Sequence, residues 1–313
     1  MNAVLEPAAL RQRASPFDLD DDAGYRAWRA DKLAQRARSA EALIVEVGDP
    51  QSLTAAERSA MLQACARWNM VVYRSARGVQ DKNTVWAVGR QLGLLRLDGN
   101  WLADEDGISS ITHSRVVRDG SGYIPYTDRP LKWHTDGYYH PQEQRIRAML
   151  LHCVRPAASG GVNALLDHEL AYIALRDASP RWLRALMAPD AMTIPQREDA
   201  DGVARAAQSG PVFSVDARAG ALHMRYTART RSIEWKSDLV TLEAVAFLER
   251  LLSDDHSGVL RLRLRLDAGM GIVANNVLHD RSAFVDDPAQ PRLIYRARYL
   301  DRVRQPEPPC PNG

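Results

Sequence analysis

The chain has 313 residues, 45% of them hydrophobic, and a formal net charge of +2. A chain of this length and composition can bury a substantial core, and we expect a single domain. Because basic and acidic residues are interspersed and nearly balanced, the composition argues against a surface for nucleic acid or another polyanion.

The cysteines and the N-terminus indicate the compartment. Cys65, Cys153 and Cys310 lie far apart without a Cys-x-x-Cys pattern, so neither a zinc cluster nor a disulfide framework is expected. The N-terminus lacks a cationic start followed by an apolar run, and no stretch is apolar for long enough to span a membrane. We expect a cytoplasmic protein without a membrane partner; a homo-oligomer remains open.

The first hundred residues read as an arm and an α/β layer of the same domain. Residues 1–22 are polar and contain proline, which indicates a loose arm. In the layer, 23–100, the clearest signal is Thr54-Ala55-Ala56-Glu57, a capping box that predicts a helix to about Trp68. The expected helices cover 25–38, 54–68 and 82–92, and the expected strands 43–47 and 70–74.

Residues 101–302 read as a core of many short strands with a helical insertion at about 168–210, and 303–313 as a C-terminal tail. Strands are expected at 108–111, 145–154, 192–194, 212–215, 221–226, 260–266, 273–278 and 292–299. Helices are expected at 169–178, 181–187 and 242–252. The segment 197–209 is polar with little periodicity, which predicts a mobile loop that forms part of a lid.

This order of elements favours a mostly β fold with α insertions: a double-stranded β-helix (jelly roll, cupin-like) core flanked by helices. A doubly wound parallel sheet is less favoured. Strands and helices do not alternate regularly, and no Gly-x-Gly-x-x-Gly follows a strand.

A short motif near the middle of the chain has the residue types of a metal site. In Trp133-His134-Thr135-Asp136-Gly137, the histidine and the aspartate are two positions apart. On an extended segment His134 and Asp136 point to the same side, so both can bind one metal ion. His-x-Asp is short enough to occur by chance, and alone it is weak evidence.

A third ligand must come from another strand. His279 is the candidate because it follows the expected strand at 273–278 and precedes an expected turn at 280–282. Two imidazoles and one carboxylate can occupy one face of an octahedral ferrous ion and leave the other positions to substrate and oxygen.

The C-terminal strand strengthens this interpretation. Alternation along 292–299 puts Arg292, Ile294, Arg296 and Arg298 on one face. For an arbitrary strand, the simpler interpretation is that the arginines are solvated. With His279 just upstream, we favour arginines that line a cavity and hold an anion.

These residues resemble the Fe(II)- and 2-oxoglutarate-dependent dioxygenases of the taurine dioxygenase and gamma-butyrobetaine hydroxylase group. The resemblance covers roughly residues 40–302. It is specific in three blocks: the metal motif and the start of a lid at 133–139, a strand and a Gly-Gly turn at 150–163, and the distal histidine with the C-terminal arginines at 276–296.

The resemblance implies roles for the matching residues. His134, Asp136 and His279 would bind Fe(II), with 2-oxoglutarate and O2 as co-substrates. Arg292 would form a two-pronged pair with the distal carboxylate of 2-oxoglutarate, which a planar guanidinium fits. Asn163 could donate to the same carboxylate through its amide.

Arg296 is a second candidate for the co-substrate, or for an anionic group of the prime substrate. Whether Arg292 or Arg296 holds the distal carboxylate stays open. The candidate substrate contacts besides Arg296 are Tyr138, Tyr139, Arg225 and Tyr226.

Two departures from the family's pattern stand out. Relatives commonly carry Asp-Asn a few residues before the distal histidine, where this chain has Asn275-Asn276, so the support of His279 differs. The gamma-butyrobetaine branch surrounds a quaternary ammonium with aromatic rings. Arg298 stands where one of them is expected, which disfavours a trimethylammonium substrate.

The implied activity is oxidation, by default hydroxylation, of a small acidic or zwitterionic molecule, with release of succinate and CO2. Desaturation or bond cleavage would differ only in how the substrate is placed. Two other classes remain open: a zinc hydrolase that uses the same His/Asp/His set, and a non-catalytic jelly-roll protein that binds a small molecule. Oxygen uptake dependent on 2-oxoglutarate would exclude both.

Overall fold

The computed structural model describes residues 15–77, 81–99, 104, 106–112, 124–199, 202–216, 219–229, 233–253 and 261–304. Cys310, most of the expected C-terminal tail and the first part of the expected N-terminal arm lie outside the described residues.

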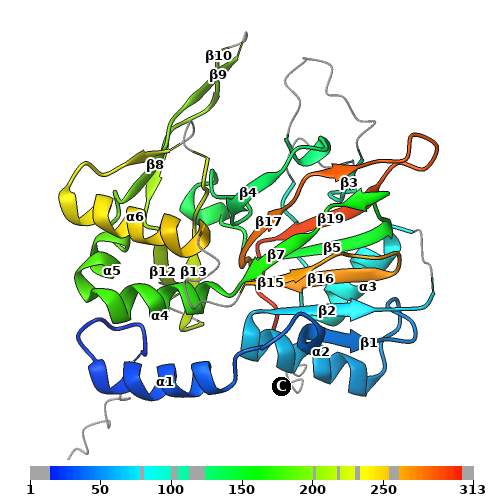
Figure 1. The fold of residues 1–313 in the computed structure, drawn as a ribbon, viewed down its shortest axis with the longest axis horizontal. Helices are drawn as coiled ribbons and strands as arrows, with labels where there is room; N and C mark the ends of the chain where they lie inside the picture. Colours follow the sequence, from blue (N-terminus) through cyan, green and yellow to red (C-terminus); the bar gives the residue numbers. More distant parts are fainter. Residues whose placement is uncertain are drawn as a thin grey trace, which may run out of the picture.

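Two β-sheets form the centre of the molecule (Figure 1). The strands of the six-stranded sheet are, in spatial order, Ile44–Glu46 (β1), Met70–Arg74 (β2), Met270–Ala274 (β16), Ala148–Arg155 (β5), Leu293–Tyr299 (β19) and Ser109–Ile111 (β3). The strands of the four-stranded sheet are Leu262–Leu264 (β15), Asn163–Leu166 (β7), Leu278–Arg281 (β17) and Leu131–His134 (β4). Most neighbouring strands are distant in the sequence, as is typical of a jelly roll.

An apolar core fills the space between the two sheets. Leu165 of β7 belongs to the same buried cluster as Ile272 of β16 and Ile294 of β19. Side chains alternate between the faces of a strand, so Ala164 and Leu166 point the other way and join a second cluster that contains helices. The two sheets therefore face each other, which confirms the predicted mostly β fold with a double-stranded β-helix core.

Two helices cover the outer face of the six-stranded sheet. Ala55–Trp68 (α2) and Asn83–Gln91 (α3) share a buried cluster with β2, β5 and β16. The start of α2 is as predicted: the Thr54 hydroxyl accepts from the backbone N–H of Glu57, and the Glu57 carboxylate accepts from the backbone N–H of Thr54. Because β2 pairs with both β1 and β16, the N-terminal layer extends the central sheet.

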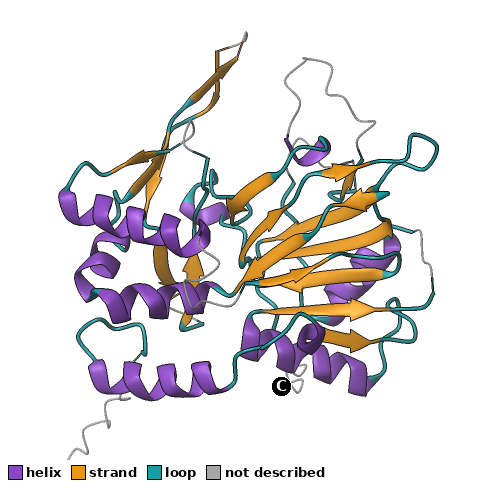
Figure 2. Cartoon of the chain, in the orientation of Figure 1, coloured by secondary structure: helices purple, strands orange, loops and turns teal. Residues whose placement is uncertain are grey.

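A second group of helices packs on the outer face of the four-stranded sheet (Figure 2). These helices are Asp22–Ala34 (α1), His168–Ala178 (α4), Pro180–Leu186 (α5) and Leu239–Ser253 (α6). Their cluster also contains the hairpin Phe213–Asp216 (β12) and Ala221–Met224 (β13), together with Trp133 of β4 and Leu278 of β17. Among the described helices, none combines the length and apolarity that crossing a membrane requires.

The described end of the N-terminal arm is packed rather than loose. Phe17 is buried, and its ring lies 5.0 Å from that of Trp28 in α1 and 5.4 Å from that of Tyr172 in α4. Aromatic contacts of this kind anchor the chain. The expectation of a loose arm is therefore wrong for residues 15–22, because polar composition does not reveal one anchoring ring.

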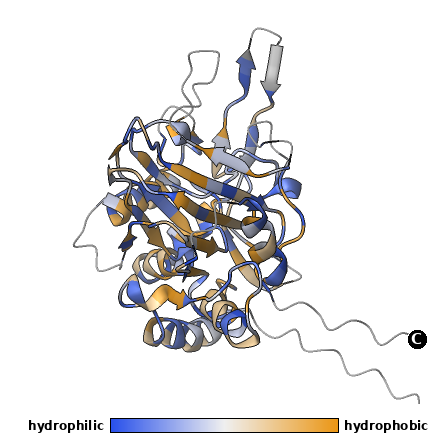
Figure 3. Ribbon diagram, turned by 90° about the vertical axis from the view of Figure 1, so that its right-hand side faces the viewer, coloured by the Kyte–Doolittle hydropathy of each residue, from blue (hydrophilic) through white to orange (hydrophobic). Residues whose placement is uncertain are grey.

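The segment 197–209, expected as a mobile loop, forms strands instead. Arg197–Asp199 (β9) and Gly202–Arg205 (β10) make an antiparallel hairpin that projects from the body (Figure 1), and Gln208–Gly210 (β11) pairs with Met192–Ile194 (β8). The residues of β9 are all hydrophilic (Figure 3), and Arg197 and Glu198 are exposed. A strand whose side chains lie in solvent shows no apolar alternation, so its sequence reads as a loop.

The expected strand at 273–278 is interrupted. β16 ends at Ala274, and Asn276 has a positive φ of 52°. A new strand, β17, begins at Leu278 and contains His279 together with part of the expected turn at 280–282. The remaining short elements are the strands Ser159–Gly160 (β6), Glu234–Trp235 (β14) and Phe284–Val285 (β18), and the 3-10 helices Glu41–Leu43, Ile124–Tyr126 and Gln142–Gln144.

Candidate active site

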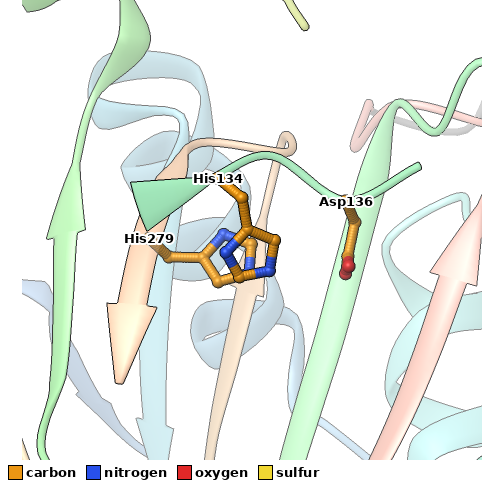
Figure 4. A group of neighbouring side chains, drawn as sticks. All are labelled: His134, Asp136 and His279. Carbon is orange, nitrogen blue, oxygen red and sulfur yellow. The ribbon is translucent and has the colours of Figure 1, made fainter. Parts of the chain in front are cut away.

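Two histidines meet across neighbouring strands of the four-stranded sheet. β17 runs antiparallel to β4, and the register pairs His279 directly with His134. Side chains directly opposite on antiparallel strands share a face. The ring centroids lie 4.2 Å apart, and the carboxylate of Asp136 lies beside them (Figure 4).

Each imidazole is oriented by a hydrogen bond to a backbone carbonyl. Nδ1 of His134 donates to the carbonyl of Lys132 at 2.9 Å, and Nδ1 of His279 donates to that of Val277 at 3.0 Å. A carbonyl can only accept, so Nδ1 carries the proton in both rings. The Nε2 lone pairs are therefore free to bind a metal.

Asp136 lies just beyond β4, in a turn that its neighbours hold. The backbone N–H of Asp136 donates to Oδ1 of Asn276 at 2.7 Å, and Nδ2 of Asn276 donates to the carbonyl of Asp136 at 2.9 Å. Gly137 has a φ of 66°, and a Cβ there would lie 2.3 Å from Cγ1 of Ile146. Only glycine fits this turn, which fixes where the Asp136 carboxylate lies.

The three side chains fit one metal ion. One ligand atom from each of His134, Asp136 and His279 lies within 4.8 Å of the other two, and all three residues are buried. Oδ2 of Asp136 is buried and has no hydrogen-bond partner among the described residues. A buried carboxylate oxygen without a partner is unfavourable unless a cation lies beside it. Two free imidazole nitrogens and one carboxylate are the ligand set of non-haem Fe(II) oxygenases.

Positive side chains hold the carboxylate in its charged form. Nη1 of Arg296 lies 3.7 Å from Oδ1 of Asp136. Burial alone would raise the pKa of Asp136, but Arg296, His279 and Arg298 keep this pKa well below its usual range. Burial and the neighbouring His279 lower the pKa of His134 to about 3. At neutral pH both groups are therefore in the protonation state that binds a metal.

The arginines of β19 and Arg292, just before it, are buried. Arg292, Arg296 and Arg298 expose 7%, 9% and 4% of their surface, so the interpretation of these side chains as solvated is wrong. Nη1 of Arg298 donates to the hydroxyl of Tyr139 at 2.8 Å, and Nη2 donates to the Asp98 carboxylate at 2.5 Å. The alternation of the strand had predicted a shared face, and that face lies towards the interior.

Arg292 and Asn163 border the same hollow. The residues that line it are Pro156, Ala157, Gly160, Gly161, Asn163, Arg265, Leu266, Arg292 and Ile294. The ring of Phe284 lies 5.3 Å from the guanidinium carbon of Arg292. Burial lowers the pKa of Arg292, which means that the protein does not fully compensate its charge. A small anion in the hollow would do so.

Arg225 and Tyr226 hold the turn that follows β4. The Arg225 guanidinium donates to the backbone carbonyls of Tyr138, Met192 and Gln208, at 2.7, 3.1 and 2.7 Å. Tyr226 is fully buried in the helical cluster, and its backbone N–H donates to the hydroxyl of Thr135 at 3.0 Å. These contacts stabilise the turn after β4. They do not support the expectation that Arg225 and Tyr226 contact the substrate.

Tyr138 and Tyr139 remain beside the metal ligands. Their rings pack edge to face, with centroids 5.2 Å apart, and the Tyr139 ring lies 4.8 Å from that of His140. Three nearby residues were not identified from the sequence as site residues: Asp98, His140 and Arg205. His140 directly follows the motif, which is a local signal. Asp98 and Arg205 come from other elements and have none.

Comparison with known proteins agrees with this site. Residues 30–298 match the family described as "Taurine catabolism dioxygenase TauD, TfdA family". A uridine-5'-phosphate dioxygenase from Streptomyces sp is 30% identical over 203 residues, which cover 62% of this chain and 71% of that protein. A uridine-5'-phosphate dioxygenase from Amycolatopsis sp is 33% identical over 178 residues, or 55% of this chain and 62% of that protein, which is just under two thirds of its length.

Solved structures show the same fold. An asparagine oxygenase in complex with Fe(II), 2S,3S-3-hydroxyasparagine and succinate has a TM-score of 0.52 at 17% identity, covering 81% of this chain and 86% of that one. The non-haem iron oxygenase OrfP in complex with Fe and alpha-ketoglutaric acid has a TM-score of 0.57 at 16% identity, covering 79% and 80%. The PvcB protein from Pseudomonas aeruginosa has a TM-score of 0.54 at 16% identity, covering 82% and 85%.

The family match spans most of the chain and confirms the family, the enzyme class and the Fe(II) and 2-oxoglutarate dependence predicted from the sequence. A zinc hydrolase or a non-catalytic binding protein is not supported. The chain belongs to the TauD/TfdA family and is an Fe(II)- and 2-oxoglutarate-dependent dioxygenase.

Proposed function

We propose that this dioxygenase hydroxylates a small anionic or zwitterionic molecule and releases succinate and CO2. The observation that carries the proposal is a group of three buried arginines: Arg296 and Arg298 in β19 lie near the metal ligands, and Arg292, just before β19, borders the hollow. Buried guanidinium groups bind anions strongly because water does not compete for them. Two relatives are named as uridine-5'-phosphate dioxygenases, so nucleoside monophosphates are the first class to test.

Each residue has a distinct role in this proposal. His134, Asp136 and His279 hold the ferrous ion, and their backbone hydrogen bonds fix their orientation. When bound, iron and 2-oxoglutarate would activate oxygen, and this chemistry allows a hydrogen atom to be removed from an unactivated carbon. Arg292 and Asn163 hold the distal carboxylate of 2-oxoglutarate in the hollow that they share.

Arg296 has a role at the metal ligand itself. Its guanidinium keeps Asp136 charged and limits the movement of the carboxylate. The burial of all three ligands excludes water from the reacting centre, which strengthens each of these charge interactions.

Succinate release tests the proposal. The protein is supplied with Fe(II), 2-oxoglutarate and oxygen, and with nucleoside monophosphates, amino acids, sulfonates, betaines and uncharged nucleosides in turn. We expect one anionic or zwitterionic class to raise succinate formation and to yield a product heavier by one oxygen atom. The matched control is His134→Ala, which should form no succinate.

Two outcomes contradict the proposal. Stimulation by uncharged compounds alone would remove the role of the arginines. A product without added oxygen, formed with stoichiometric succinate, would replace hydroxylation with desaturation or bond cleavage.

A further inference from the structure

Two arginines from separate strands and the next residue in the chain, His140, surround the ring of Tyr139. Nη1 of Arg298, in β19, donates to the Tyr139 hydroxyl at 2.8 Å. The guanidinium carbon of Arg205, in β10, lies 5.7 Å from the centre of the Tyr139 ring. The His140 ring lies 4.8 Å from it, centroid to centroid. Tyr139 thus links the projecting hairpin to the central sheet.

This cluster adjoins the metal ligands. Arg298 follows Arg296 by two residues, so both lie on the same face of β19, and Arg296 is 3.7 Å from the Asp136 carboxylate. The positive charge of Arg298 also contributes to the low pKa of Asp136. A molecule that contacts the cluster would therefore lie within reach of the metal centre.

The cluster is separate from the hollow beside Arg292. Arg292 and Arg298 are six residues apart on an extended segment, which places their Cα atoms about 20 Å apart. Asn163 and Arg292 border the hollow, whereas no residue of the Tyr139 cluster lines it. The two places can hold two different anionic groups.

The donors of the cluster are not satisfied within the protein. Among the described residues, Nε of Arg205, Nε of Arg298 and Nε2 of His140 are buried and have no hydrogen-bond partner. The two guanidinium Nε–H groups can only donate, and buried donors are nearly always paired, so two of them beside one ring point to a missing acceptor. An oxyanion offers several acceptor lone pairs at once.

Of the two arginines in the cluster, Arg205 is the one whose positive charge is not compensated by a carboxylate among the described residues. Asp98 compensates Arg298 at 2.5 Å and lies 3.7 Å from Nε2 of His140. No ion pair is found for Arg205 within the described parts of the chain; its Nη2 donates to the uncharged carbonyl of Pro195 at 2.8 Å. An anion placed here would meet one uncompensated positive charge.

The local backbone supports this orientation. The β9–β10 register shifts between Val203 and Arg205, where Arg205 pairs with Arg197. An irregularity of this kind redirects the side chain that follows it. Arg205 is the last residue of β10, and its guanidinium lies over the Tyr139 ring.

We infer that Arg205, Arg298 and His140 form an anion site, next to the metal centre and distinct from the 2-oxoglutarate hollow, that holds a phosphate or carboxylate group of the prime substrate. The inference rests on the proposed function and assigns Arg205 as the residue that sets the preference for an anionic substrate.

Binding measured without turnover tests the site. Calorimetry is performed in the absence of oxygen on the protein with Fe(II) and 2-oxoglutarate. The probes are inorganic phosphate, acetate and uridine 5'-monophosphate, each at constant ionic strength. The phosphate and acetate arms distinguish the two oxyanions. The variants are Arg205→Gln and Arg205→Lys, and the matched control is Arg197→Gln, its cross-strand neighbour.

We expect at least one probe to bind saturably and Arg205→Gln to weaken this binding about tenfold or more, the effect of losing one charge-assisted contact. Arg205→Lys should restore part of the affinity, because it keeps the charge. Arg197→Gln should leave it unchanged. The affinity for 2-oxoglutarate should stay constant in all variants.

Three results would overturn the site: no saturable binding of any probe, equal losses in the Arg205→Gln and Arg197→Gln proteins, or an equal loss of 2-oxoglutarate affinity. The proposed function fails separately. If the wild-type protein releases succinate with an anionic substrate while Arg205→Gln leaves the KM for that substrate unchanged, the function stands and the site does not.

Discussion

Asn276 connects the two segments that supply the metal ligands. It lies at a positive φ three residues before His279, and its amide bonds the backbone of Asp136 in both directions and the carbonyl of Ile146 at 2.7 Å. From the sequence, Asn276 was expected to affect the support of His279. The structure shows that its side chain bonds the backbone of Asp136 instead. Such a contact spans distant parts of the chain and leaves no local pattern.

Replacing Asn276 with alanine should loosen the Asp136 turn. The change leaves buried backbone groups without partners, each at a cost of about 1 to 3 kcal/mol. We expect Asn276→Ala to weaken metal binding about 10- to 100-fold, as loss of a group that orients a ligand does. Titration with Fe(II) under nitrogen measures the affinity, and urea unfolding the stability. Asn276→Asp keeps the acceptor Oδ1 but turns a second acceptor towards the carbonyls of Asp136 and Ile146, so it should also weaken metal binding. An unchanged affinity in both proteins would refute the role.

Arg292 should control the affinity for 2-oxoglutarate. Arg292→Ala removes a buried charge-assisted pair worth about 2 to 3 kcal/mol, so the co-substrate concentration that gives half the maximal rate should rise about 30- to 150-fold. Arg292→Lys should recover little, because an ammonium lacks the planar fork. Steady-state kinetics with varied 2-oxoglutarate measures the effect. Arg265→Ala is the control: it lines the same hollow, but its guanidinium donates to the carbonyl of Ala157. If only Arg296→Ala raised this concentration, Arg296 would hold the distal carboxylate.

At the scale of elements, what the sequence could predict depended on burial. The strands β2, β5 and β19 and the helices α2 and α4 lie close to their expected positions, because one or both of their faces are apolar. The β9–β10 hairpin and the break between β16 and β17 were missed. The first contains β9, whose residues Arg197 and Glu198 are exposed, and the second depends on the positive φ of Asn276. Neither feature changes the pattern of apolar residues.

Helix α4 gives the fold a sensitivity to acid. His168 is buried at its first turn, and its Nε2 bonds the carbonyl of Leu222 in β13 at 3.1 Å. Burial lowers the pKa of His168 to about 4; Glu169 opposes this shift, and Arg302 and Lys32 add to it. In the unfolded chain a histidine has a pKa near 6.5, so protons favour the unfolded state below that pH.

The stability that His168 contributes is therefore complete above about pH 6.5 and is lost as the pH falls towards 4. Between pH 7 and pH 5 the loss should be about 2 kcal/mol. Urea unfolding at both pH values measures it, and His168→Gln should reduce the difference by about that amount. His134 and His223 also have lowered pKa values, but they contribute equally to both proteins. The same pH dependence in both proteins would rule out His168 as its cause.

For the whole molecule, a buried ion pair joins the helical group to the central sheet. Nζ of Lys32 in α1 lies 2.7 Å from the Asp167 carboxylate and also contacts Glu169. Asp167 accepts from Nδ2 of Asn69, the residue between α2 and β2, at 2.9 Å. Three parts of the fold thus depend on one ammonium group. The jelly-roll class could be predicted from strand patterns, but this arrangement of the helices could not, because it rests on a few contacts of this kind.

Removing that ammonium should destabilise the protein as a whole. Lys32→Met leaves the buried Asp167 carboxylate and the half-buried Glu169 carboxylate without their partner, and a broken buried pair costs about 3 to 5 kcal/mol. The matched control is Arg26→Met in the same helix, whose contact with Asp22 is solvent-exposed and should contribute about 0.5 kcal/mol or less. Equilibrium unfolding of both variants measures the difference. Equal losses in the free energy of unfolding would show that the buried ion pair contributes no more stability than the exposed one.

The pairing of His134 with His279 couples cofactor loading to folding. The two rings come from strands far apart in the sequence, and they meet only when β4 and β17 are joined. An unfolded chain cannot chelate the ion through this set, so ferrous ion should bind the native state almost exclusively. The melting temperature of the wild-type protein should then rise with the logarithm of the free iron concentration. The melting temperature of the Asp136→Ala protein, which lacks one ligand, should not depend on iron. The supply of iron would then determine the stability of the folded enzyme as well as its catalytic rate.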